Sequence, residues 1–411
     1  MNIENLTALA VNSLKDTKGP LKEFRQGQID LFKENGLFSP IKDSYKFTNL
    51  ETFFETLLDV KQLALPDFTK TDFPTMVFID GELNHQDPLP QGVKITKISD
   101  RFDEIKSKLT SSNALSHLHH GLLQEGLLIE IEKNQEISKP IRILNLLSLN
   151  KVSAPTNFIF ADRQSQVTVI EETISLESSH AFIAETYITA LEGARVEHIQ
   201  LDQESSNSLN HGSVFADVER DATVRSFFFT MKGKLNRKNL TLNLNEAGAN
   251  GESYSLFLTN NREHSDINTA INHKAADTTS DQMAKGILDG ESKGIFTGLI
   301  HIFPKSQRVA SAQLNKNLLL SKKAQLHSQP QLEIFADDVK CSHGSTTGQL
   351  SDDEVFYFQA RGIPADKART LLAHGFGMEI VQKITNREAR DYIGQTVMGH
   401  LETKFNLGGK E

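Results

Sequence analysis

The chain has 411 residues, of which 38% are hydrophobic and 24% charged, and its formal net charge is −9. The negative charge makes nucleic acid a poor candidate partner, and the single cysteine, Cys341, excludes an internal disulfide and fits a reducing compartment. The opening residues lack a basic segment followed by an apolar run, and no apolar stretch of about 18 residues occurs. We therefore expect a cytoplasmic protein with neither a secretory signal nor a transmembrane helix.

The first 125 residues are predicted to be mostly helical. Apolar spacing indicates amphipathic helices in residues 19–36 and 43–60, and again in 99–109 and 113–123. Between them, TMVFIDGEL (75–83) predicts a strand that runs into a turn at Asp80 and Gly81.

A repeat of β-strand character follows from residue 126. SQVTVIEE (165–172), ARVEHIQL (194–201), ATVRSFFF (222–229) and ANGESYSL (249–256) each open with a small residue, and their starts are 29, 28 and 27 residues apart. A second strand precedes each turn, and no helix intervenes. Steady spacing of this kind is typical of a solenoid, so we predict a parallel β-helix and keep a set of ordinary hairpins in a β-sandwich as the alternative.

The last part of the chain is predicted to be helical again. Ser351 and Glu354 have the spacing of a capping box, and Gly362 is placed to end the helix that follows. Pro364 suits the first turn of a second helix, which we expect to end near Gly375. The prediction is thus a mainly β protein in three parts: a helical domain over 1–125, the β-helix over 126–348 and a helical domain over 349–411.

Two candidate metal ligands stand together near the end of the β region. Cys341 and His343 are two residues apart, so in an extended strand they share a face and can reach one ligand. Thiolate and imidazole suit zinc, copper(I) or an iron–sulfur centre, but a closed structural site needs four ligands. The missing ligands would come from another chain, or else Cys341 is an inert buried thiol and His343 a surface residue.

Other candidate sites are weaker. His117, His119 and His120 form a cluster that could bind metal, although the leucine spacing around them favours a helix with these histidines on its solvated face. The adjacent carboxylates Glu171 and Glu172 would face opposite sides of a strand, which does not make an acid/base pair. No phosphate-binding loop or nucleophile motif occurs.

Residues 283–376 resemble the SufB/SufD family of the SUF iron–sulfur cluster assembly system. The resemblance rests on HGSTTGQL (343–350), FYFQARGI (356–363) and the AHGF ending (373–376). It implies a right-handed parallel β-helix between helical segments, and a cytosolic complex with a SufB-type paralogue and a SufC-type ABC ATPase. By that resemblance His343 faces a cysteine of the SufB-type partner across a heterodimer interface, where a nascent cluster or iron is held transiently. Cys341 occupies a position that is often cysteine in SufD-like chains.

Departures from the SufB-like pattern favour a SufD-like subunit. That pattern has a cysteine near Leu314 and glutamate on either side of the histidine, where this chain has Ser342 and Gly344. The resemblance therefore implies a non-catalytic scaffold subunit. Two alternatives remain open: a β-helix carbohydrate-active enzyme, which the absence of Trp and of an export signal argues against, and a homo-oligomeric scaffold that pairs with itself when the partner is absent.

Overall fold

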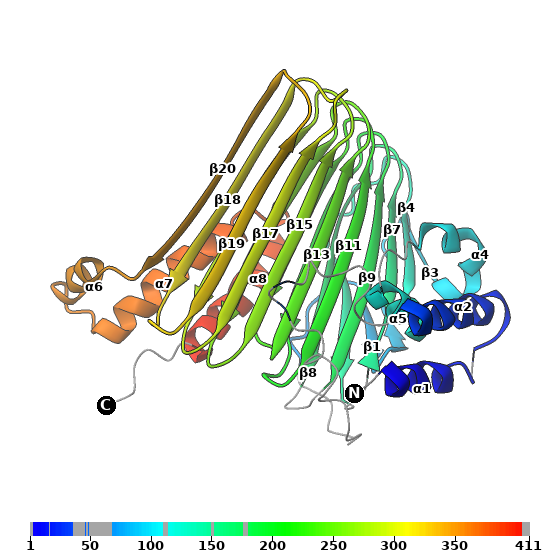
Figure 1. Cartoon of the computed structure of the whole chain (residues 1–411), viewed down its shortest axis with the longest axis horizontal. Helices are drawn as coiled ribbons and strands as arrows, with labels where there is room; N and C mark the ends of the chain where they lie inside the picture. The colour runs from blue at the N-terminus through cyan, green and yellow to red at the C-terminus, as the bar shows by residue number, and fades with distance from the viewer. Residues whose placement is uncertain are drawn as a thin grey trace.

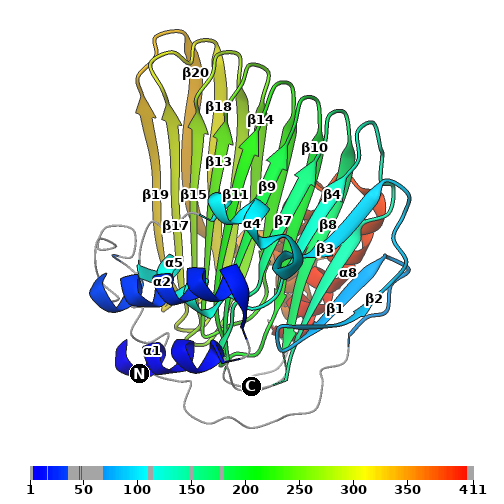
Figure 2. The same cartoon turned by 90° about the vertical axis from the view of Figure 1, so that its right-hand side faces the viewer.

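The computed structural model describes residues 3–15, 17–35, 46, 48, 68–109, 114–148, 152–175 and 180–404. Two ten-stranded sheets lie face to face and form a parallel β-helix, with helices outside each sheet (Figures 1 and 2). The parallel β-helix is therefore confirmed, and the sandwich of hairpins is not the fold. The predicted helix over 43–60 falls outside the described residues.

Each sheet takes one strand from every coil. The first sheet runs in the order β2 (Glu82–Gln86), β1 (Thr75–Ile79), β5 (Ile141–Leu147), β8 (Gln166–Ser175), β10 (Arg195–Gln203), β12 (Thr223–Thr230), β14 (Asn250–Thr259), β16 (Thr279–Leu288), β18 (Val309–Leu319) and β20 (Val339–Gln349). The second sheet runs in the order β19 (Gln325–Ile334), β17 (Lys293–Ile302), β15 (His264–His273), β13 (Leu235–Leu244), β11 (Leu209–Val218), β9 (Ala181–Ala190), β7 (Thr156–Ala161), β4 (Leu127–Ile131) and β3 (Val93–Lys97), with β6 (Val152–Ser153) beside β9.

The sequence repeat matches the strand pairing of the first sheet, because residues one repeat apart are paired. Gln166 pairs with Arg195, Arg195 with Thr223, and Thr223 with Asn250, all in parallel. Equivalent residues of successive coils therefore stack directly on one another, which is why the repeat is visible in the sequence.

A left-handed residue stands two positions before each of these strands. It is Gly193 before β10, Asp221 before β12 and Gly248 before β14, each with a positive φ between 54° and 77°. The small residue that follows each turn is buried, because it points into the corner of the coil; Ala194 and Ala222 are examples. The turn thus requires both features that the repeat displays: a residue that tolerates positive φ and a small residue after it.

The core between the sheets is apolar along the edge where β8, β10 and β12 begin, and it becomes polar farther along these strands. Val167, Val196 and Val224 stack in one interior column, in the largest buried apolar cluster of the described residues. Nearer the middle, the interior Glu171 accepts hydrogen bonds from Asn157, Thr186 and Gln200 and contacts His198. These bonds satisfy a carboxylate that would otherwise be costly to bury.

The N-terminal helices pack outside the second sheet. They are α1 (Ile3–Ser13), α2 (Gly19–Asn35), the short turns η1 (Ile98–Arg101), α4 (Phe102–Ile105) and η2 (Lys106–Lys108), and α5 (Ala114–Leu122). The apolar side chains of α1, α2 and α5 share one cluster with residues of β6, β9, β11 and β13, and those of η1 and α4 pack in a second cluster with β4, β7 and β9. Residues 1–125 also supply β1, β2 and β3 to the two sheets, and the boundaries of the predicted three-part division stay a prediction.

The C-terminal helices are α6 (Asp352–Gln359), α7 (Ala365–Val381) and α8 (Arg387–Lys404), of which α7 and α8 cover the outer face of the first sheet (Figure 1). Gly362 follows α6 with a φ of 79°, as predicted. Two details of the prediction are wrong: Ser351 makes no side-chain capping bond, and α7 continues past Gly375 to Val381. It continues because its later turns bury apolar side chains against the first sheet: Ile380 and Val381 share one cluster with Leu256.

Candidate functional site at the open end of the β-helix

Cys341 and His343 lie in β20, the outermost strand of the first sheet. Within the described part of the chain β20 is paired on one side only, with β18, and β19 ends the second sheet in the same way. Figure 1 shows these last strands at the end of the β-helix that is far from the N-terminal helices. Both candidate ligands are therefore on a coil that no further coil of the described residues covers.

The two residues share the interior face of the coil. Cys341 packs beside an apolar cluster that contains Ile300 and Val309, and the Ser345 hydroxyl hydrogen-bonds that of Ser328 in β19, 2.8 Å away. His343 lies two residues from Cys341 and two from Ser345, and residues two apart in a strand face the same side. It is exposed because its column, which runs through Gln282 and Gln313, has no next member in the part of the chain that the structure describes.

Cys341 is half-buried and protonated at neutral pH. Burial raises the pKa of its thiol, and the backbone hydrogen bond at Ser311 only partly offsets this. A protonated thiol is a weak ligand and a weak nucleophile until a metal or a second charge lowers its pKa. His343 is exposed and Cys341 is half-buried, so His343 is the more accessible of the two donors.

Exposed apolar side chains surround the same end of the molecule. Phe335, directly after β19, is 59% exposed, and its ring lies 5.4 Å from that of His301. Ile334 and Phe303 are also exposed. Open strand edges with exposed aromatic residues are typical of a surface that another polypeptide covers.

Sequence reasoning did not identify β19 as part of this end, although a signal was present. Pro330 lies inside β19, and proline within a sheet is confined to edge strands or bulges because it lacks an N–H. Its position identifies β19 as an outermost strand.

The weaker candidates are placed as follows. His119 and His120 are fully buried against the second sheet, so the expected solvated face is wrong for both; only His117 is half-buried, beside Gln28. Glu171 and Glu172 face opposite sides of β8, as predicted: Glu171 lies inside the coil, while Glu172 meets Arg142 outside it.

Comparison with known proteins identifies the family. The sequence model of the SUF system FeS cluster assembly SufBD core domain matches residues 145–376, more than half of the chain. The chain belongs to the SufB/SufD family. This match runs from the last residues of β5 through β20 and includes α6 and the first part of α7.

Individual relatives fit the SufD-like assignment. The chain is 29% identical to the iron-sulfur cluster assembly protein SufD of Escherichia coli, over 69% of each chain. It is 27% identical to the SufBD family protein slr0076 of Synechocystis over 91% of this chain and 89% of that one, and 27% identical to the chloroplastic protein ABCI7 of Arabidopsis thaliana over 82% and 76%. Among the described residues, no helix combines the length and apolar character needed to cross a membrane.

Proposed function

We propose that this SufD-like chain is a non-catalytic scaffold subunit of the SUF iron–sulfur assembly machinery. It pairs through β19 and β20 with a SufB-type paralogue, and the nascent cluster is built and passed on at that junction. The observation that carries the proposal is that both candidate ligands lie on the uncovered coil, on the face that a partner strand would extend. The single thiol of the chain favours action in the reducing cytoplasm.

The chemistry of the site requires a second chain. His343 offers an imidazole nitrogen and Cys341 a thiol sulfur, and both donors suit iron and iron–sulfur species. Two donors do not complete a tetrahedral set. The cluster or iron is therefore cargo held jointly with partner ligands, and binding would release the Cys341 proton.

The C-terminal helices are the proposed contact for the SufC-type ATPase. Phe356 and Tyr357 on α6 are 68% and 55% exposed. Behind them, α7 is fixed to the β-helix by the ion pair between Lys285 and Glu379, and the Glu197 carboxylate accepts a bond from the backbone N–H of Thr385. A force applied to the helices would thus reach the first sheet, which ends in β20.

The test is reconstitution with the SufB-type partner and the ATPase. His343→Ala should leave folding and complex formation intact, yet abolish maturation of a recipient iron–sulfur protein. Ser342→Ala, one residue away on the opposite face, is the matched control and should retain activity. Full activity of His343→Ala would overturn the proposal.

A second candidate is a homo-oligomeric scaffold, favoured by the same uncovered edges. Light scattering of the purified chain with and without the SufB-type protein distinguishes the two. A self-dimer that persists when the partner is present would favour this candidate, and its replacement by a heterodimer would favour the first. No feature of the described residues favours the carbohydrate-active alternative.

A further inference from the structure

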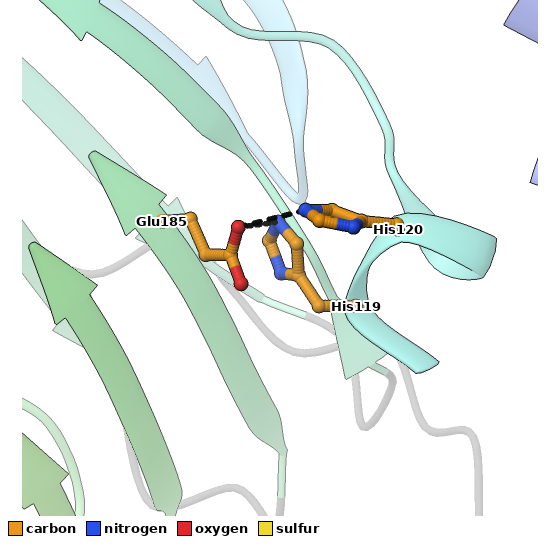
Figure 3. Close-up of side chains that lie close together, drawn as sticks. All are labelled: His119, His120 and Glu185. Carbon is orange, nitrogen blue, oxygen red and sulfur yellow. Dashed lines mark hydrogen bonds and ion pairs between the residues drawn. The ribbon is translucent and has the colours of Figure 1, made fainter. Parts of the chain in front are cut away.

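A second group of metal-ligating side chains lies far from the open coil, between α5 and β9. Figure 3 shows His119 and His120 of α5 converging on the Glu185 carboxylate of β9. His120 Nε2 is 2.8 Å from Glu185 Oε2 and His119 Nε2 is 3.9 Å from it. The three side chains are at most 5% exposed, and their ligand atoms all lie within 4.8 Å of one another.

The ring of His119 is held as that of a metal-ligating histidine would be. Its Nδ1 lies 2.9 Å from the backbone oxygen of Ile183, and a hydrogen bond there places the proton on Nδ1. The Nε2 lone pair then faces Glu185 and the Thr156 hydroxyl, which is 2.8 Å away. Histidine ligands in proteins commonly donate their other ring N–H to a backbone carbonyl, which fixes the tautomer and the ring orientation.

Burial and mutual contact perturb the electrostatics of His119 and Glu185. Burial lowers the pKa of His119 to about 4, against the opposing pull of Glu185. Burial alone would raise the pKa of Glu185, but the two histidines and the hydrogen bond from Tyr187 bring it down to about 2.

The distances suit a small tetrahedral ion. Zinc bonds to nitrogen and oxygen of about 2.0–2.1 Å place neighbouring ligand atoms roughly 3.3–3.4 Å apart. The separations of Glu185 Oε2 from His120 Nε2 and His119 Nε2, 2.8 Å and 3.9 Å, fall on either side of that value, so each needs a change of about 0.5 Å. The Thr156 hydroxyl and the second oxygen of Glu185 are further oxygen donors at the same place.

We propose that His119, His120 and Glu185 form a structural zinc site that fastens the N-terminal helices to the β-helix. Two imidazoles and a carboxylate are ligands that zinc accepts, and a site this deeply buried leaves no open position for substrate. Because α5 packs against α2, the ion would hold both helices on the outer face of β9. This role is independent of cluster assembly at the open coil.

The test measures zinc retained by the full-length chain in a Cys341→Ser/His343→Ala background, which removes the ligands of the open coil. After gel filtration with a chelator, we expect about one zinc per chain. His117→Ala changes the neighbouring histidine on the same helix and should retain that zinc. Glu185→Gln, which has nearly the same shape, should retain less than a tenth of that zinc. Changes to residues that only hydrogen-bond to a metal ligand lower metal affinity roughly 10–100-fold, and the loss of a ligand should lower it further.

Refolding keeps the proposal testable even if a variant misfolds. The chain unfolded in chelator and refolded with zinc should melt at a higher temperature than the chain refolded without it. Cobalt supplied in place of zinc should give the visible absorption of a four-coordinate ion. Zinc content near zero in both the purified and the zinc-refolded protein would overturn the proposal, as would equal zinc in the Glu185→Gln and parent chains.

Discussion

One buried polar network helps to attach α8 to the β-helix, beside an apolar cluster, and Tyr392→Phe tests it. The Tyr392 hydroxyl lies 2.9 Å from both carboxylate oxygens of Glu172 and 3.0 Å from the Arg142 guanidinium. The guanidinium in turn donates to Glu172 over 2.7 Å, and the side chains of this ion pair are at most 1% exposed. Burial and the adjacent carboxylate raise the pKa of Tyr392, so the phenol keeps its proton and donates it.

The expected cost follows from what the network loses. Removing the hydroxyl takes one donor from a buried carboxylate and one acceptor from a buried guanidinium, which should cost about 1.5–3 kcal/mol. Glu172→Gln should cost more, about 3–5 kcal/mol, because it leaves the Arg142 charge buried without a counter-charge. The double variant should cost less than the sum, since both changes disrupt the same network.

Hydrogen exchange of α8 during urea titration is the appropriate assay, because a stacked repeat array need not unfold in one step. The α8 amides of Tyr392→Phe should lose protection at lower urea than those of the parent chain. Tyr357→Phe, which removes the hydroxyl of an exposed ring on α6, should change stability by less than about 0.5 kcal/mol. If Tyr392→Phe behaves like Tyr357→Phe, this network does not hold α8 in place.

Three further predictions concern other parts of the molecule. Because burial raises the pKa of Cys341, alkylation followed by mass spectrometry should be slow at pH 7 and accelerate as the pH rises; rapid labelling at pH 7 would contradict the half-buried placement. Burial lowers the pKa of His273 to about 4, below its unfolded value, so its contribution to stability is fully present above pH 6.5 and declines as the pH falls towards 4. That contribution is about 3 kcal/mol. In His273→Gln the urea midpoint should therefore fall less steeply as the pH is lowered from 6.5 to 4 than it does in the parent chain. An equally steep fall in both chains would argue against a buried neutral His273. Phe335→Glu should leave the circular dichroism spectrum and melting temperature unchanged while weakening pairing with the SufB-type partner in gel filtration, and undiminished pairing would exclude this surface from the interface.

The β-helix could be predicted because each coil requires the same residue types at equivalent positions, and this repeat is visible in short stretches of the sequence. In-register parallel stacking repeats the same requirements at each corner, so Ala194, Ala222 and Ala249 mark the coils without any knowledge of their contacts. The path of α7 could not be predicted in this way. Glycine normally favours the end of a helix, but beyond Gly375 the burial of Ile380 and Val381 against the first sheet stabilises the continuing helix.

The candidate sites show the same limit. The shared face of Cys341 and His343 follows from strand geometry alone, and the structure confirms it. The burial of His120 does not follow, because its partner Glu185 is 65 residues away and is brought to α5 only by the stacking of the coils. A helix with leucines on one side gives no sign that its other side is also covered.

The two ends of the β-helix differ in a way that bears on assembly. At the N-terminal end the sheets finish in β2 and β3, which are antiparallel to their neighbours and so interrupt the stacking. At the other end β20 stops in the parallel register of the coils before it, so a strand from a second chain can add directly. Neighbouring strands place opposed side chains about 4.5–5.5 Å apart, close enough for His343 and its opposite residue to share one metal ion. A shift of one residue in that pairing would turn the partner's ligand to the other face. The proposed function therefore requires a fixed register between the two chains, and changes that shift it should abolish cluster assembly while the chains still bind each other.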